Sequence, residues 1–110
     1  MRIAAAAYPI DWFDSWTDYV AKLTRWVTDA VGQDADLLVF PEYGAMELAA
    51  LGRPDPEDVE GALRAAAEYL PAADALHSEL AQAFGVTILS ASGPVYDGER
   101  PTNRARLFGP

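Results

Sequence analysis

Three short apolar runs alternate with longer segments of helical periodicity along this chain of 110 residues. The runs cover residues 2–8, 37–40 and 86–91. Parallel strands need crossover segments of this length, whereas antiparallel strands can be joined by a tight turn. The alternation therefore predicts the α/β class, with all three strands in one sheet and the last two parallel.

The first crossover segment predicts a helix near residues 15–31, because its apolar residues recur at steps of three and four. Ser15 suits the N-cap, with Asp18 close to the positive end of the helix dipole. Gly32 suits the left-handed residue that follows a helix. The apolar residues of this face are Trp16, Tyr19, Val20, Leu23, Val27, Ala30 and Val31.

The second crossover segment predicts two helices within residues 56–84. Asp55 and Pro56 are typical of an N-cap and a first helical residue, and Pro71 is expected to end the first of these helices. The next helix then covers residues 72–84 and ends at Gly85, and residues 46–51 favour a single helical turn. Right-handed crossovers place consecutive helices on the same side of a sheet, so we expect all the helices on one face.

Residues 95–108 predict a hairpin around Asp97-Gly98, with residues 102–108 as the return strand. The run 37–40 is uniformly apolar, which is typical of a strand covered on both faces. No helix follows residue 108 to cover the second face, and the segment 107–110 does not resemble the end of a domain. We therefore expect a truncated domain with one mixed sheet and helices on one face.

The composition excludes several kinds of site. The chain has no cysteine, which excludes disulfides, thiolate metal sites and a cysteine nucleophile within these residues. His77 is its only histidine, so a multi-histidine metal site is impossible, and we expect neither metal nor cofactor. A net charge of −9 disfavours nucleic-acid binding. No uncharged stretch approaches the roughly 20 residues that span a bilayer, so we expect a cytoplasmic protein.

Glu42 is the strongest candidate for a functional residue. It follows the strand 37–40 directly, and ligand sites of open α/β sheets gather beyond the carboxyl ends of the strands. Pro41 fixes the direction in which the chain leaves the strand. A partly desolvated carboxylate in this place would suit a general base, and the alternative is a carboxylate that only caps a turn.

The order of several motifs resembles the carbon–nitrogen hydrolase (nitrilase/amidase) superfamily. The main one is Phe40-Pro41-Glu42 after a hydrophobic strand, and the resemblance extends over essentially all 110 residues. The supporting segments are Arg2–Ala6, Tyr43-Gly44, Val86–Ala91, Ser92-Gly93-Pro94 and Asn103-Arg104-Ala105. Ala7 departs from the pattern, because many members carry glutamine there.

The resemblance implies a Glu-Lys-Cys mechanism on small amides or nitriles, in which a cysteine attacks the substrate and the glutamate takes the thiol proton. Only the glutamate matches here, at Glu42. The lysine would lie just past Pro110 and the cysteine further on, and Lys22 matches neither the position nor the neighbours of that lysine. The family's α-β-β-α four-layer sandwich makes residues 1–110 the N-terminal half of one domain, inactive alone and homo-oligomeric when complete.

Two other residues and two other functions stay open. Glu47 suits a paired-carboxylate site with Glu42, a solvated loop acid or a group that supports Glu42. His77 suits a surface or hydrogen-bonded histidine better than a ligand. The chain also fits a small non-catalytic α/β binding or regulatory module, or half of a split protein whose partner chain supplies lysine and cysteine.

Overall fold

The computed structural model describes all residues from 1 to 110 and confirms the α/β class. Two α-helices and one 3₁₀ helix alternate with six short strands. In chain order the elements are β1 (Ile3–Ala5), α1 (Trp16–Gly32), β2 (Leu37–Val39), the 3₁₀ helix η1 (Gly44–Gly52), α2 (Val59–Phe84), β3 (Thr87–Leu89), β4 (Gly93–Tyr96), β5 (Pro101–Arg104) and β6 (Leu107–Phe108).

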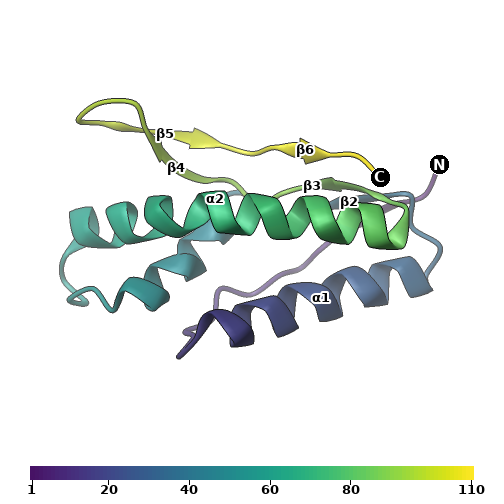
Figure 1. Cartoon of the computed structure of the whole chain (residues 1–110), viewed down its shortest axis with the longest axis horizontal. Coiled ribbons are helices and arrows are strands. Elements are labelled where there is room, and N and C mark those ends of the chain that lie inside the picture. The colour runs from purple at the N-terminus through teal and green to yellow at the C-terminus, as the bar shows by residue number, and fades with distance from the viewer.

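The main sheet has the strand order β1-β2-β3-β6. The strands β1, β2 and β3 lie in one sheet with β2 and β3 parallel, as predicted. The strand β1 is also parallel to β2, and β6 joins the edge of β3 antiparallel. Both long helices lie on the same side of this sheet, with α1 beside α2 (Figure 1). The predicted mixed sheet with helices on one face is therefore confirmed.

The helix α1 follows the prediction at its start and differs at its end. The hydroxyl of Ser15 accepts a hydrogen bond of 3.3 Å from the backbone N–H of Asp18, as an N-cap does. Gly32 is not the left-handed residue, because the helix continues through it. Asp34 has the positive φ of 62° instead, a conformation that aspartate tolerates better than most residues.

The two helices predicted within residues 56–84 are one continuous helix, α2, which contains Pro71. The N-cap is Asp58 rather than Asp55, since its carboxylate accepts a 2.8 Å hydrogen bond from the N–H of Gly61. Pro71 is exposed and removes one helical bond on the solvent side, while Leu70 and Ala73 on the buried side hold the helix to the core. Neither α2 nor any other helix is long and apolar enough to cross a membrane.

The predicted return strand 102–108 is divided between two sheets. β5 pairs with β4 in a separate two-stranded hairpin, and β6 pairs with β3 in the main sheet. The chain changes sheets between them at residues 105 and 106, where the Ser90 hydroxyl accepts a 3.0 Å bond from the N–H of Arg106. A sequence pattern of alternating residues does not reveal such a change of partner.

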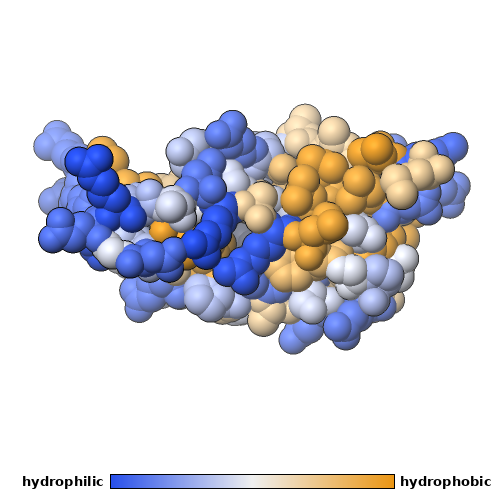
Figure 2. Space-filling view, turned by 90° about the horizontal axis from the view of Figure 1, so that it is seen from above, coloured by the Kyte–Doolittle hydropathy of each residue, from blue (hydrophilic) through white to orange (hydrophobic).

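The two faces of the main sheet differ sharply. The inner residues Leu38 and Ile88 are at most 2% exposed beneath the helices. The outer face has no cover, and Ile3 and Leu107 are 59% and 66% exposed on it. The strand β2 is therefore not covered on both faces, as its sequence had suggested. Figure 2, which looks from above, shows hydrophobic side chains gathered in one patch at the right of the view.

This uncovered face leads to the first prediction. Since exposed sheet faces and edges promote association, we expect the isolated 110 residues to bind a hydrophobic dye or to self-associate. Replacing Ile3 and Leu107 by lysine should reduce dye binding and association. Val59→Lys is the matched control, because Val59 is 72% exposed on α2, away from the sheet. A monodisperse monomer that binds no dye and melts cooperatively would contradict the prediction.

Candidate functional site

Glu42 lies beyond the carboxyl end of β2, close to the turn that follows β3. The backbone N–H of Tyr43 donates a 2.8 Å hydrogen bond to the hydroxyl of Ser92. From the hairpin, the amide of Asn103 donates a 3.4 Å bond to a carboxylate oxygen of Glu42. Three separate segments of the chain therefore meet around this carboxylate.

A hollow of about 320 Å³ opens at this sheet edge. Its polar lining comes from Glu42, Ser90, Ser92 and Asn103, and its apolar lining from Phe40, Leu89 and Ala105. This volume is within the range of sites that hold small molecules. The expected partial desolvation of Glu42 is not found: the residue is exposed, because the chain turns outward at Pro41 and nothing covers the outer face of the sheet.

Close packing explains why small residues stand beside Glu42. A Cβ atom on Gly44 would lie 2.8 Å from the Cβ of Ala91, and one on Gly93 would lie 2.7 Å from the Cβ of Ala45. Both distances are too short for carbon atoms. The N–H of Ala45 also donates a 3.2 Å bond to the carbonyl of Ser92. The segment after β2 is thus fixed directly against the segment after β3.

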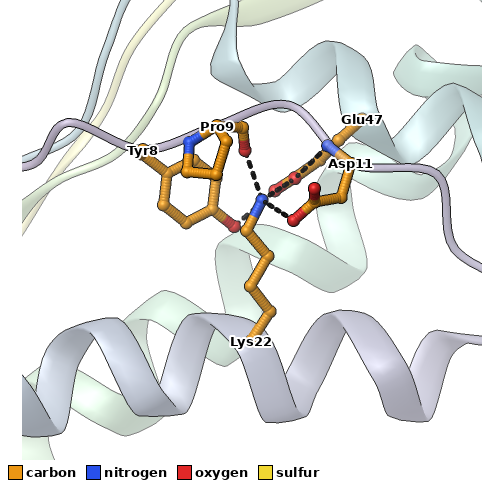
Figure 3. A network of polar contacts seen from close by, with 5 residues as sticks. All are labelled: Tyr8, Pro9, Asp11, Lys22 and Glu47. Atoms are coloured by element: carbon orange, nitrogen blue, oxygen red, sulfur yellow. Dashed lines mark hydrogen bonds and ion pairs between the residues drawn. The ribbon is translucent and has the colours of Figure 1, made fainter.

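A second group of polar residues lies in the interior between α1 and η1 (Figure 3). The ammonium of Lys22 contacts Glu47 at 2.6 Å and Asp11 at 2.9 Å, and it also donates to the carbonyl of Pro9. The hydroxyl of Tyr8 donates to the other carboxylate oxygen of Glu47. The side chains of Lys22 and Glu47 are only 4% and 1% exposed.

The charges in this interior network compensate one another. Burial raises the pKa of Glu47, whereas hydrogen bonds from Lys22 and Tyr8 oppose that rise by favouring the carboxylate. Burial and the neighbouring Glu47 raise the pKa of Tyr8, so its hydroxyl stays protonated and donates. The Lys22 ammonium also lies 3.8 Å from the centre of the Tyr8 ring, a favourable cation–π distance.

This network corrects the expectations for Glu47. It is neither a solvated loop acid nor a paired carboxylate of Glu42, because it is buried against Lys22 while Glu42 is exposed beside Asn103. Sequence reasoning missed the pair because it judged Lys22 only against the catalytic lysine of the family. One signal was present: Lys22 stands on the apolar face of its helix, three residues after Tyr19, and a lysine there needs a buried partner.

His77 is a buried, hydrogen-bonded histidine of α2, consistent with the simpler of its two interpretations. Its Nδ1–H donates a 2.6 Å bond to the carbonyl of Ala73, and its ring stacks on Phe108 at 5.5 Å. Burial lowers its pKa below the ordinary 6.5. The ring is therefore neutral when it is folded, and it ties α2 to the edge strand β6.

The lowered pKa of His77 predicts a pH dependence of stability. In the unfolded chain His77 is protonated below about pH 6.5, whereas in the folded chain its protonation requires a lower pH. The stability conferred by the neutral ring is complete above that pH and decreases below it, by up to about 1.4 kcal/mol per pH unit. His77→Phe should remove this contribution, as unfolding of both proteins at pH 7.5 and 5.5 would measure. Equal pH dependence of the two proteins would contradict it.

No three His, Asp or Glu side chains are grouped closely enough to hold a metal ion. What the site offers is a carboxylate that can accept a proton, two serine hydroxyls and an amide around a small hollow. Comparisons of the chain with protein-family models and with curated proteins found no match.

Proposed function

We propose that this chain is the N-terminal portion of a hydrolase of carbon–nitrogen bonds other than peptide bonds, with Glu42 as its general base. The observation that carries the proposal is the place of Glu42: beyond the central parallel strand β2, at the edge of a small hollow, beside Ser92 and Asn103. Its support from sequence is the ordered resemblance to the nitrilase and amidase superfamily.

In the proposed reaction, Glu42 takes the proton of a cysteine thiol while the sulfur attacks the carbonyl carbon of an amide. The tetrahedral intermediate expels the amine, which receives the proton, and leaves a thioester on the cysteine. Water activated by the same carboxylate then releases the carboxylic acid and restores the thiol. A lysine ammonium would stabilise the negative charge that develops on the carbonyl oxygen.

The cysteine and the lysine of this proposal come from residues after Pro110. The 110 residues contain no cysteine, and the lone lysine is buried in the interior with Glu47 and Asp11 as partners. The apolar outer face of the sheet suits a second sheet of the same domain, as in the four-layer sandwich of the family. In this proposal residues 1–110 alone are inactive, and the complete protein is cytoplasmic and homo-oligomeric.

One observation favours a second candidate, a non-catalytic binding or regulatory module. The chain forms a core of 18 buried hydrophobic residues of its own, and Glu42 is exposed in a hollow that needs no further chemistry to bind a small polar molecule. The two candidates differ in whether a bond is broken.

The test is ammonia release from a panel of small aliphatic and aromatic amides and nitriles. We expect the full-length protein to release ammonia from at least one of them, and residues 1–110 alone to release none. Binding of a panel compound without release by the full-length protein would favour the module. Release by residues 1–110 alone would contradict the Glu-Lys-Cys assignment.

A further inference from the structure

The interior network of Tyr8, Lys22 and Glu47 joins three segments that are distant in the sequence. Tyr8 lies after β1, Lys22 lies in the middle of α1, and Glu47 lies in η1 (Figure 3). Each residue is at most 7% exposed, so water does not compete for these contacts. Hydrogen bonds to charged groups are among the strongest in proteins, and these fix the position of the η1 backbone.

The segment that joins Glu42 to Glu47 is short, and backbone hydrogen bonds hold it. The N–H of Met46 donates a 3.0 Å bond to the carbonyl of Tyr43, and the N–H of Gly44 donates a 3.2 Å bond to that of Pro41. Ser92 holds the same segment from the other side through the N–H groups of Tyr43 and Ala45.

This path has little room to adjust. The Gly44 backbone is packed so closely against Ala91 that a single added carbon would lie 2.8 Å from the Ala91 side chain. Tyr43 is held at a φ of 57°, a conformation that a non-glycine residue adopts only when its surroundings impose it. A shift of Glu47 is therefore transmitted to the backbone of residues 43–46 and to the adjacent Glu42.

We infer that Tyr8, Lys22 and Glu47 are positioning residues, which fix the Glu42 carboxylate through the η1 backbone; this inference rests on the function proposed above. A general base acts only within about 2.6–3.2 Å of the proton it takes. A displacement of about 1 Å caused by a distant substitution can cost about 10²-fold in rate. The network lies on the interior side of η1, so it acts by geometry and not by contact with substrate.

The test variant is Tyr8→Phe in the full-length protein, alone and combined with Glu42→Gln. Tyr8→Phe removes only the hydroxyl that donates to Glu47 and keeps the ring between Trp26, Phe40 and Lys22. We expect kcat to fall by between about tenfold and about 10²-fold at a temperature where the variant is folded. The double variant should be no slower than Glu42→Gln alone, because a positioning residue has no effect once the group it positions is absent.

The control is Tyr96→Phe, which removes a buried hydroxyl on β4 that has no hydrogen-bond partner, and its kcat should match the wild type. If Tyr8→Phe does not fold, Asp11→Asn replaces it, alone and combined with Glu42→Gln. Asp11 is half exposed, and this substitution weakens its ion pair with Lys22. A folded Tyr8→Phe with wild-type kcat, or losses that multiply in the double variant, would overturn this inference alone. A wild-type protein that hydrolyses no amide or nitrile would overturn the proposed function itself.

Discussion

Replacing Glu42 by glutamine is expected to lower kcat of the full-length protein by about 10²- to 10⁴-fold and to leave the fold intact. The amide of glutamine has the shape of the carboxylate but does not accept a thiol proton at neutral pH. Since the Glu42 side chain is exposed and its one hydrogen bond, from Asn103, is 3.4 Å long, the substitution removes little structural support. Steady-state amide hydrolysis together with a circular dichroism melt measures both quantities.

The matched control is Glu57→Gln, which makes the same chemical change at an exposed residue between η1 and α2. Its kcat and melting temperature should equal those of the wild type. Hydrolysis by Glu42→Gln at a rate near that of the wild type would show that another group takes the proton, and the assignment of the base would be wrong.

The second large effect is expected at Lys22. Replacing it by methionine leaves the carboxylate of Glu47 buried without its nearest cation, and breaking a buried ion pair in this way typically costs about 3–5 kcal/mol. Urea unfolding of the full-length protein, followed by tryptophan fluorescence, measures the change. Trp26 packs against Tyr8 at 5.4 Å, so its emission reports on this region.

Arg64→Met provides the comparison for this prediction, because Arg64 and Glu60 form an ion pair that is more than half exposed. Exposed pairs contribute about 1 kcal/mol or less. The double variant Lys22→Met with Glu47→Leu should regain part of the stability, since it removes both buried charges. If Lys22→Met lowers the free energy of unfolding by less than about 1 kcal/mol, the interior network contributes little to stability.

Much of the fold follows from local patterns that the sequence displays directly. The period of the apolar residues in α1 and the cap at Ser15 depend on neighbouring residues, and both were predicted correctly. The apolar runs, separated by crossover lengths, placed three strands in one sheet and made the last two parallel, and both features are confirmed. These features need no knowledge of distant contacts.

The parts that were predicted wrongly depend on tertiary packing. Pro71 is a helix breaker by local rules, yet α2 continues through it because the buried face of the helix holds it in place. The division of residues 102–108 between two sheets depends on which strand edges are available in space. Neither feature can be predicted from local propensity.

The site was predicted in part for the same reason. The position of Glu42 after a parallel strand placed it near Ser92 correctly, because parallel strands end at a common edge. Its exposure depends on what covers the outer face, which the strand pattern does not specify. The pair of Lys22 and Glu47 joins residues 25 positions apart, and only the packing of α1 against η1 brings them together.

The structure of the full-length protein is the most direct test of the central proposal. We expect a cysteine sulfur and a lysine ammonium, both from residues after 110, within hydrogen-bonding reach of the Glu42 carboxylate, and a second sheet over Ile3 and Leu107. A Glu42 carboxylate that faces open solvent, with no cysteine beside it and the outer face of the sheet still uncovered, would contradict the account.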